Sequence, residues 1–574
     1  MSSIPMPQHY TGRRNLILLS AFILCLPALA AGLMGDDYMH YALLTADLPI
    51  AKPNDLSLFG LFSFINGDPE RNRLLMDYSL IPWWTYAELK YAFWRPLSEI
   101  FHWVDHQLWP EQPWLMHLHN IAWYMIALCL VARLYKQYLP TAGTALLALF
   151  LYGLDSTHGF TISWISNRNA LLALTFGLLT FLLYTRWREE GGIGSLMLSL
   201  LTLLLGLLSA ELGISVFGYI GAYALFMDKR GPVKGVLATL PYFAVIVGWW
   251  AIYKYAGFGA AHADAYYVDP ASQPLSFLMK AAERLPVLLA SQWGIVPADL
   301  YTLSGASNYT YVAICAVMLI LSLIPVLMVQ IKNRATLFWL FGMLFSILPA
   351  LAASPYDRLL LFPGIGASAL LANFLIQIKL KRYTPSSSIL KTYTTLIFFV
   401  MVFIHLIMAP ILLPVMAYST KFMSDQVSTT PSYFQNIENI EHKKLVLFSP
   451  PLASSLAIAA LRYHRQDPIP ARIWTITTLD DGLQYHASGN RLLVSREAGF
   501  IDGPIEESVR NMEKYPFQEN DEVILSGLRI GIHQLNESGK PSQLSLTFDQ
   551  PVNSSEYVFL KWDANSNQYT QLDF

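Results

Sequence analysis

Charged residues are scarce in this chain. Only 14% of its 574 residues are Asp, Glu, Lys or Arg, whereas 54% are hydrophobic and the mean hydropathy is +0.39. Soluble domains carry roughly 25% charged residues, so this composition excludes an ordinary soluble protein and indicates a polytopic membrane protein. The formal net charge of −2 does not indicate a binding partner, because the basic and acidic residues are distributed unevenly among the loops.

Cysteine is also scarce. Cys25, Cys129 and Cys315 are the three cysteines of the chain, and each lies within an apolar run. They therefore cannot form a disulfide framework or a zinc site, and we expect them to pack as small apolar side chains. The sequence shows no internal repeat.

Long apolar runs are abundant over the first three-quarters of the chain. A helix that crosses a bilayer needs about 17–25 residues, predominantly apolar. We expect about eleven transmembrane helices, of which the third is short and the fifth and sixth are nearly fused. The expected spans are 14–34, 115–133, 142–155, 169–186, 194–210, 212–228, 235–256, 310–331, 335–353, 359–378 and 393–416. Ala28-Leu29-Ala30 resembles a signal-peptidase site, but we expect the first span to remain as an uncleaved anchor.

Basic residues predict the orientation of these spans. Lys and Arg cluster in every second short connection, and such clusters mark the cytoplasmic side. The clusters are at 13–14, 133–136, 186–188, 228–234, 332–334 and 379–382. The N-terminus is then cytoplasmic, and the loops 35–114 and 257–309 and the C-terminal segment lie outside.

The outer segments are predicted to be structured. Short amphipathic helices lying on the membrane are expected at 86–93, 97–108 and 276–292. From about residue 420 the composition becomes that of a soluble domain, with strand-like segments separated by Gly, Asn, Asp and Pro. The strand-like segments are 444–448, 471–476, 491–494, 522–525, 528–533, 544–548 and 557–562, and 452–463 resembles a helix. We expect a transmembrane domain over 1–419, which includes both outer loops, and a small β-rich outer domain over 420–574.

Two adjacent carboxylates follow the first span directly. Asp36 and Asp37 stand in Gly35-Asp36-Asp37-Tyr38, immediately after the apolar run that ends at Met34. Acidic residues at a bilayer boundary are costly to misplace and often mark function. The pair is therefore the first candidate for chemistry in this chain.

Further polar residues collect at the outer ends of the spans. They are Arg95, His117, Asn120, Asp155, His158, Arg168, Glu211, Asp357 and Arg358. A transporter would place its polar groups near the bilayer midplane, often on broken helices. Charges at the bilayer boundary favour chemistry at the membrane surface. They indicate a lipid-linked substrate that enters the site laterally from the bilayer.

These residues together resemble a known family. The chain resembles the GT-C superfamily of polyprenyl-phosphate-sugar-dependent glycosyltransferases, and within it the bacterial relatives of the tetratricopeptide-carrying protein O-mannosyltransferases. The matching segments follow in order over roughly the first 380 residues. They are Trp94-Arg95-Pro96-Leu97-Ser98, His117-Leu118-His119-Asn120, Trp164-Ile165-Ser166-Asn167-Arg168-Asn169, Ser209-Ala210-Glu211-Leu212-Gly213 and Tyr356-Asp357-Arg358-Leu359-Leu360.

The chain departs from the family pattern at several positions. A His-Pro pair and a Glu are replaced by Asp155-Ser156 and Phe160, although His158 is retained. Ala210 stands where the family has Lys, Asp357 stands where it has Glu, and no tetratricopeptide repeats follow. These departures give no support for mannose as the sugar.

The resemblance implies a bacterial inner-membrane glycosyltransferase, a hexosyl- or pentosyltransferase that acts at the periplasmic face. An acceptor hydroxyl on protein, lipid or glycan would attack a sugar carried on a polyprenyl phosphate, with inversion. Asp36 or Asp37 would be the base, and Arg358, then Arg168 and Arg95, would hold the phosphate. Glu211, His117, His158 and Asp357 complete the expected substrate site. A divalent metal ion is a possible cofactor, and no nucleic-acid partner is expected.

Other functions stay open at this point. A transferase of the same fold could move a preassembled glycan or a lipid-linked pentose, which predicts a roomier outer cavity. A transporter or flippase of a lipid-linked sugar predicts essential polar groups at mid-membrane depth. A catalytically inactive relative would serve as a membrane scaffold through its β-rich domain.

Overall fold

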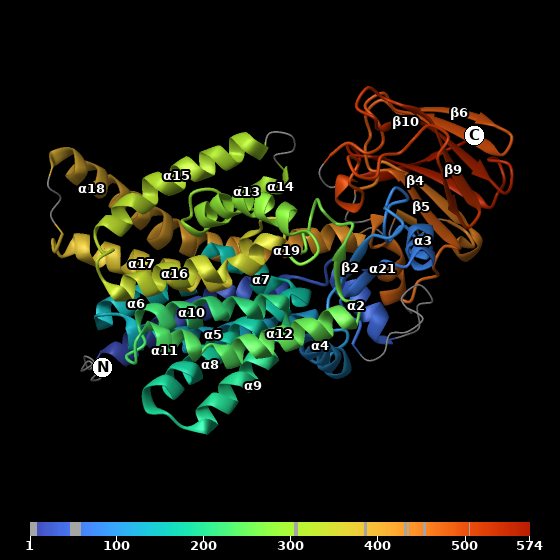
Figure 1. The fold of residues 1–574 in the computed structure, drawn as a ribbon. Coiled ribbons are helices and arrows are strands. Elements are labelled where there is room, and N and C mark those ends of the chain that lie inside the picture. Colours follow the sequence, from blue (N-terminus) through green and yellow to red (C-terminus); the bar gives the residue numbers. More distant parts are fainter. Residues whose placement is uncertain are drawn as a thin grey trace. The chain divides into compact units, whose positions relative to one another are not determined.

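The computed structural model describes residues 9–45, 59–303, 308–383, 387–429, 433–434, 437–451, 455–503 and 506–574. The chain divides into two compact units (Figure 1). Unit 1 comprises Met1–Gly32, Trp94–Phe258 and Pro270–Lys421, and unit 2 comprises Leu33–Phe93, Gly259–Asp269 and Phe422–Phe574. The last boundary falls inside one helix, close to the expected one at 419/420. The compact units place most of the first outer loop with the C-terminal segment, and the domain division drawn from the sequence stays a prediction.

Unit 1 is built from helices. Their ends carry the usual signals: Thr141 and Asn333 cap helices through their side chains, and Pro96, Pro113 and Pro274 each open one. The longer helices are α1 (Tyr10–Cys25), α4 (Pro96–Leu108), α5 (Pro113–Tyr138), α6 (Ala142–Gly153), α8 (Arg168–Glu190), α9 (Ile193–Ser209), α10 (Val216–Phe226), α12 (Leu240–Tyr255), α13 (Pro274–Gln292), α15 (Asn308–Met328), α16 (Arg334–Ser346), α17 (Leu361–Lys379), α18 (Ser388–Val402) and α19 (Ala409–Thr429).

Short helical turns join several of these helices. They are η1 (Leu26–Ala30), η2 (Ser156–His158), α7 (Gly159–Ser163), η3 (Ile165–Asn167), η4 (Glu211–Ser215), α11 (Pro232–Leu237), α14 (Leu300–Leu303), η6 (Leu348–Ala352) and η7 (Asp357–Leu359), with the π-helical turn η8 (Phe403–Met408) between α18 and α19. Several sequence-predicted site residues lie on or beside these turns, because the turns break the regular backbone and direct side chains away from the helix stack.

The expected polytopic helical fold is confirmed. Among the described residues, eight helices are long and apolar enough to cross a membrane, and a ninth is formed if the bent pair Ala142–Gly153 and Ser156–Ser163 is one span. Two shorter apolar helices, Ile193–Ser209 and Glu211–Phe226, match the expected fifth and sixth spans. Each of the eleven expected runs therefore corresponds to an apolar helix.

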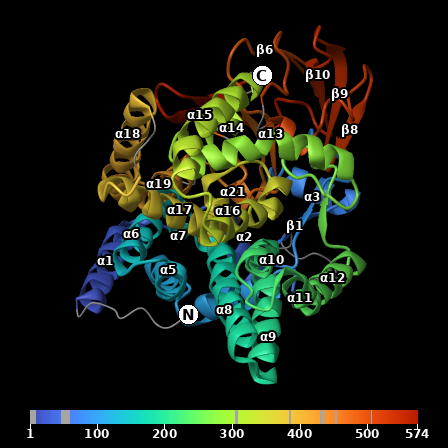
Figure 2. The same cartoon turned by 60° about the vertical axis from the view of Figure 1, so that its left-hand side comes forward.

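Close helix packing in unit 1 uses small residues. Helices α8 and α9 lie side by side in both views (Figures 1 and 2), and α10 packs along α16. A Cβ on Gly218 of α10 would lie 2.5 Å from the backbone nitrogen of Ser346 at the end of α16. Small residues let helix backbones approach this closely, which is a common basis of helix association in membranes.

Unit 2 combines three sheets with three short helices. A three-stranded antiparallel sheet of order β1-β2-β3 joins the two outer loops, and a five-stranded antiparallel sheet has the order β6-β7-β10-β9-β8. In the four-stranded sheet β12-β11-β4-β5, β4 pairs in parallel with both β11 and β5. The strands of the first sheet are β1 (Ser63–Asn66), β2 (Lys90–Ala92) and β3 (Gly259–Ala261), and the helices are α2 (Asp36–Thr45), α3 (Pro69–Asp77) and α21 (Ile458–His464). The C-terminal strands are β4 (Lys444–Phe448), β5 (Arg472–Thr477), β6 (Gln484–Ser488), β7 (Arg491–Ser495), β8 (Glu522–Leu525), β9 (Leu528–Leu535), β10 (Pro541–Phe548), β11 (Tyr557–Asp563) and β12 (Gln568–Leu572).

The expected β-rich C-terminal segment is confirmed, with two corrections of detail. Strands β6 and β12 were not expected, and the segment 86–93 is not a helix but a turn that leads into β2. The aromatic residues of 86–93 bond within unit 2, as the Tyr91 hydroxyl does by donating to the Ser508 carbonyl at 3.0 Å. The other two amphipathic segments are helices, α4 and α13. The expected helix 452–463 corresponds to α21, and residues 452–454 lie outside the described residues.

Candidate functional site

The acidic pair occupies the first turn of α2 in unit 2. Gly35 makes the turn before it with φ +48°, a conformation that favours glycine. The Asp37 carboxylate accepts a hydrogen bond from the Met34 amide at 3.0 Å, and the Asp37 amide donates to the Met34 carbonyl at 2.9 Å. Carboxylates in the first helical turn are stabilised by the unpaired N–H groups and the helix dipole. Asp37 thus ties the start of α2 to the residue before the turn, and Asp36 beside it is half-buried.

His117 lies near the N-terminal end of α5 and contacts the end of the first span, within unit 1. Its Nε2 is 3.2 Å from the carbonyl oxygen of Gly32, four residues before Asp36. Asn120, one turn further along α5, donates to the carbonyls of Ile162 and Trp164. Both side chains are buried on the same face of α5, as their spacing predicts. They connect α5 to the segment after the first span and to the connection between the third and fourth spans.

Arg95 and Glu211 are brought together from distant parts of the sequence. The Arg95 Nη2 and Nε lie 2.8 and 2.9 Å from the same Glu211 carboxylate oxygen, and both side chains are partly exposed. Arg95 precedes α4 and Glu211 begins η4, and Ser98 strengthens this junction by donating to the Ser209 carbonyl at 2.8 Å. The Glu211 carboxylate therefore holds the Arg95 guanidinium in place.

Arg168 is a fully buried ion-pair partner. Its guanidinium contacts the Asp105 carboxylate, and both side chains are fully buried. It also donates to Asn120 Oδ1 at 2.6 Å and to the Met116 carbonyl at 3.0 Å. A guanidinium whose donors are used in this way holds α4, α5 and α8 together. Its expected role with a phosphate has no supporting contact here and stays a prediction.

His158 is buried at the bend between α6 and α7. Its Nδ1 is 3.0 Å from the Tyr124 hydroxyl, which also donates to the Gly153 carbonyl. The Tyr152 ring packs against the imidazole with centroids 4.7 Å apart. These contacts describe an interior hydrogen-bonding histidine at an outer connection.

Asp357 and Arg358 lie in η7, between two membrane-length helices. One Asp357 carboxylate oxygen accepts hydrogen bonds from the Ser291 hydroxyl at 2.6 Å and the Ala298 amide at 2.7 Å. Loss of hydration, together with the neighbouring Asp299 carboxylate, raises the pKa of Asp357 to about 7. This carboxyl group therefore carries a proton for part of the time at neutral pH.

Arg358 is stacked between two aromatic side chains. The centre of its guanidinium is 4.3 Å from the Tyr356 ring centroid and 5.2 Å from the Trp164 ring centroid. Stacking uses the faces of the planar guanidinium, whereas phosphate oxygens bind to its edge. The contacts of Arg358 thus include two aromatic rings, whereas Arg168 and Arg95 each pair with a carboxylate.

The site residues divide between the two units. Asp36 and Asp37 belong to unit 2, and Arg95, His117, His158, Arg168, Glu211, Asp357 and Arg358 belong to unit 1. Sequence analysis missed Asp105, Ser291 and Asp299 as partners of these residues. Asp299 follows a Pro-Ala turn in the second outer loop, where a single acid carries no pattern that could single it out.

Among the described residues, no group of three or more His, Cys, Asp or Glu side chains is arranged to hold a metal ion. The divalent ion expected as a possible cofactor stays a prediction.

Comparison with known proteins gives structural similarities only. No family model matches the sequence, and no curated protein matches it. The chain is similar to the oligosaccharyltransferase AglB of Archaeoglobus fulgidus in complex with an inhibitory peptide and a dolichol-phosphate, with 12% identity, a TM-score of 0.44 and coverage of 81% of this chain and 65% of that one. It is also similar to ArnT of Cupriavidus metallidurans bound to undecaprenyl phosphate, with 12% identity, a TM-score of 0.37 and coverage of 82% and 87%.

A further structure of the Archaeoglobus oligosaccharyltransferase, in complex with Zn and sulfate, has 12% identity, a TM-score of 0.41 and coverage of 80% of this chain and 62% of that one. The chain spans less than two thirds of the length of the oligosaccharyltransferase structures it matches. At 12% identity and TM-scores below 0.5, these similarities assign no activity to the chain, and its chemistry is argued from its own residues.

Proposed function

We propose that this protein is a membrane glycosyltransferase that moves a sugar from a polyprenyl-phosphate donor to an acceptor hydroxyl. The observation that carries the proposal is Arg358, stacked between Tyr356 and Trp164 at an outer connection between apolar helices. A guanidinium presented in this way suits the phosphate of a lipid that stays in the bilayer. A dolichol-phosphate and an undecaprenyl phosphate, the lipids bound in two of the similar structures, belong to the class of lipid proposed here.

The proposed reaction is a single displacement with inversion. The acceptor oxygen forms a bond to the anomeric carbon while the bond from that carbon to the phosphate oxygen breaks. The hydroxyl proton passes to a carboxylate, and the electron pair of the broken bond leaves with the polyprenyl phosphate. One base is sufficient, because a phosphate needs no proton to leave, unlike the leaving group of a glycosidase.

Asp36 is our first choice for the base, and Asp37 is the second. Asp36 is half-buried, whereas Asp37 is buried and accepts the Met34 amide through one carboxylate oxygen. The Asp36 carboxylate is therefore the more accessible of the two to an acceptor hydroxyl. In this assignment Asp37 fixes the backbone and Asp36 accepts the acceptor proton.

The remaining candidates divide between phosphate binding and support. Arg358 binds the leaving phosphate and stabilises the charge that develops on it. Arg95 and Glu211 form a partly exposed pair that can turn toward a sugar hydroxyl. His117 and His158 hold the outer connections in place through buried contacts. We place the reaction at the periplasmic face of a bacterial inner membrane, in accord with the basic loops.

The test is a matched assay in membranes from a host that lacks the gene. Wild type, Asp36→Asn, Asp37→Asn and Arg358→Ala are compared by mass spectrometry of surface protein, lipid and glycan, and of the polyprenyl-phosphate sugar. Arg186→Ala is the control, because this exposed arginine pairs only locally with Glu190. We expect Asp36→Asn and Arg358→Ala to fold, to lose the transferred sugar and to accumulate the lipid donor. Wild-type levels of sugar transfer in all variants would contradict the proposal and favour a transporter or a scaffold.

A further inference from the structure

The C-terminal part of unit 2 contacts the helix that carries the acidic pair. Helix α2 packs against α21, more than 400 residues later in the chain. The Thr45 hydroxyl, at the end of α2, lies 2.9 Å from the Tyr463 hydroxyl. The His464 ring meets Tyr41 edge-on at 4.6 Å and Tyr38 at 5.6 Å between centroids. One side of α2 is therefore held by the last turn of α21.

The contacting residues of α2 form a single stripe. Tyr38, Tyr41 and Thr45 are spaced three and four residues apart, so they share one helix face. Asp36 and Asp37 stand at the N-terminal end of the same helix. Any shift of the stripe against α21 moves the acidic pair with it, because a helix of this length is nearly rigid along its axis.

Helix α2 is too short to be stable on its own, and it also packs through His40 against Phe62 and Phe64. It has 10 residues, and isolated helices shorter than about 12–15 residues are marginal in water. Its N-terminus is set by the Gly35 turn and the bond between Asp37 and Met34. The contacts with α21 fix the other end and the rotation about the helix axis.

Helix α21 is itself packed into the interior of unit 2. Ile458, Ala459, Ala460 and Leu461 are buried in the core of unit 2. The Arg462 guanidinium donates to the Pro468 carbonyl at 2.6 Å, which closes the turn leading to β5. Tyr463 and His464 therefore project from an element that the β-rich core holds in place.

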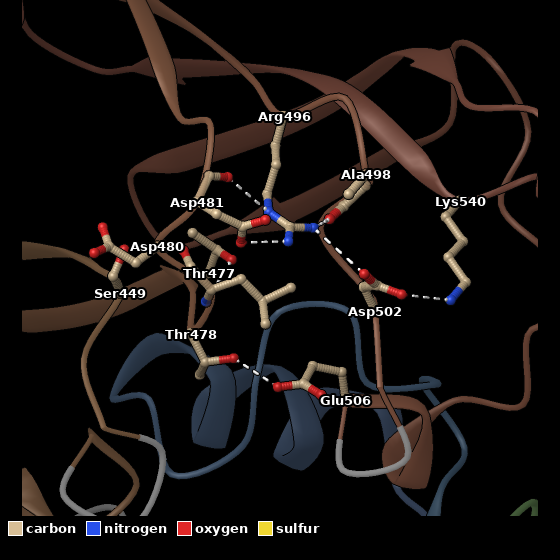
Figure 3. A network of polar contacts seen from close by, with 12 residues as sticks. Ser449, Thr477, Thr478, Asp480, Asp481, Arg496, Ala498, Asp502, Glu506 and Lys540 are labelled. Carbon is tan, nitrogen blue, oxygen red and sulfur yellow. Dashed lines mark hydrogen bonds and ion pairs between the residues drawn. The ribbon is translucent and has the colours of Figure 1, made fainter. Parts of the chain in front are cut away.

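Polar contacts fix other parts of the first outer loop to the same core. The Trp83 and Trp84 indoles donate to the carbonyls of Ile476 and Glu506, each at 2.9 Å. The Glu506 carboxylate accepts the Thr478 hydroxyl at 2.8 Å (Figure 3). In the same network the buried Arg496 bonds to Asp481 at 2.6 Å, and Lys540 pairs with Asp502 at 3.1 Å (Figure 3). The first outer loop, which precedes α4, is thus bonded to the C-terminal segment of unit 2.

We infer that Tyr463 and His464 are positioning residues for the acidic pair, Asp36 and Asp37. The C-terminal segment therefore contributes to catalysis by the transferase. This inference rests on the proposed function, because it assigns the proton acceptance to the end of α2. Neither side chain is assigned contact with the sugar or the acceptor. They act by setting where the carboxylates stand.

The test uses the full chain and initial rates with a purified polyprenyl-phosphate sugar. Tyr463→Phe removes only the hydroxyl that meets Thr45, and His464→Ala removes the ring that packs on α2. We expect kcat to fall roughly fivefold to tenfold for each, as for one lost hydrogen bond or ring contact. The KM for the lipid donor should stay unchanged, since the phosphate site lies in unit 1. His464→Phe keeps an aromatic ring and should restore most of kcat.

Two controls separate positioning from stability. His442→Ala removes an exposed histidine, and Tyr557→Phe removes a hydroxyl that accepts the Gln550 amide in the same unit. Both should retain wild-type kcat, and thermal unfolding of all variants should show that the differences are not losses of folded protein. Unchanged kcat in Tyr463→Phe and His464→Ala, while Asp36→Asn is inactive, would overturn this inference alone. Full activity in Asp36→Asn and Asp37→Asn would overturn the proposed function itself.

Discussion

Three arginines at the outer ends of unit 1 have the same charge but different surroundings. Arg168 is buried in an ion pair, Arg95 shares a partly exposed pair with Glu211, and Arg358 is stacked on two aromatic rings. The sequence motifs identified all three and placed Arg358 first. They could not show that Arg168 is buried in an ion pair, because its partner Asp105 is distant in sequence. The environment, rather than the residue type, decides which arginine holds structure and which can bind a ligand.

Substitution of Arg168 is expected to affect stability first. Arg168→Ala leaves the buried Asp105 carboxylate with His119 but without its guanidinium partner, and loss of one partner of a buried ion pair costs about 3–5 kcal/mol. Thermal unfolding in detergent, followed by loss of monodisperse protein, measures this effect. Arg358→Ala should unfold within a few degrees of wild type and lose activity instead. Equal destabilisation by both substitutions would contradict the distinction between the two arginines.

The protonation of Asp357 predicts a pH dependence of stability. Its pKa is raised from the ordinary value of 3.8 to about 7, so the folded state keeps a proton that the unfolded state releases. The folded state binds more protons between these values, and the stability from this group is therefore present at low pH and lost as the pH rises through about 7.

Asp357→Asn tests this pH dependence directly. The amide retains an oxygen that can accept from Ser291 and Ala298 but does not ionise. We expect the unfolding temperature of wild type to fall from pH 6 to pH 8 more than that of the variant. Asp573→Asn, at an exposed position, is the control and should follow wild type. Parallel curves for wild type and Asp357→Asn would show that this carboxyl group does not titrate in the range.

At the scale of elements, the sequence predicted the helices and strands in which apolar residues recur with a clear periodicity. The apolar helices and the strands β4 and β8 match their expected segments closely, because continuous or alternating apolar residues mark buried helices and strands. Strands β6 and β12 are edge strands with exposed, polar side chains, and they pair through backbone bonds that leave no apolar pattern. Segment 86–93 has the aromatic content of an interfacial helix, but its residues bond to distant parts of unit 2.

The start of α2 gives a prediction for one element. Asp37→Ala removes the bond to the Met34 amide, and a lost helix cap costs about 1 kcal/mol. Hydrogen exchange of the α2 amides, measured by mass spectrometry, should become roughly fivefold faster, since 1.4 kcal/mol corresponds to a factor of ten. Asp36→Ala leaves the bond between Asp37 and the Met34 amide intact and should change the exchange less. A larger effect from Asp36→Ala would reverse the roles assigned to the two carboxylates.

At the scale of the whole molecule, the two units are not consecutive in sequence. Unit 2 is assembled from three separate segments, and its first segment is joined to the last by the indole of Trp84 and by the bond between Ser79 and Thr475 at 2.6 Å. Composition predicted a domain boundary near residue 420, because soluble segments contain fewer apolar residues than membrane-spanning segments. It could not show that 33–93 belongs with the C-terminal strands, since such long-range pairing leaves no local pattern.

Trp84→Ala should therefore destabilise a segment hundreds of residues away. The side chain is fully buried, and removal of a buried aromatic ring costs about 3–5 kcal/mol. We expect limited proteolysis to cut the variant within 422–574 under conditions in which wild type resists. Trp103→Ala, at a half-exposed position in unit 1, is the matched control. If the new cuts were confined to 33–93, the two segments would not share one cooperative fold.

The discontinuous make-up of unit 2 also has a consequence for biosynthesis. Helix α2 leaves the ribosome roughly 400 residues before α21, and synthesis at about 5–20 residues per second separates the two by roughly 20–80 s. During that interval the first outer loop has no C-terminal sheet to join, while successive spans enter the membrane. Asp36 and Asp37 are thus synthesised long before the contacts between α2 and α21 can form, and a chaperone that binds unfinished segments would find its earliest substrate there. A chain truncated before strand β11 would insert in the membrane but would lack the strand that pairs with β4, so its first outer loop would have no complete C-terminal sheet to pack against.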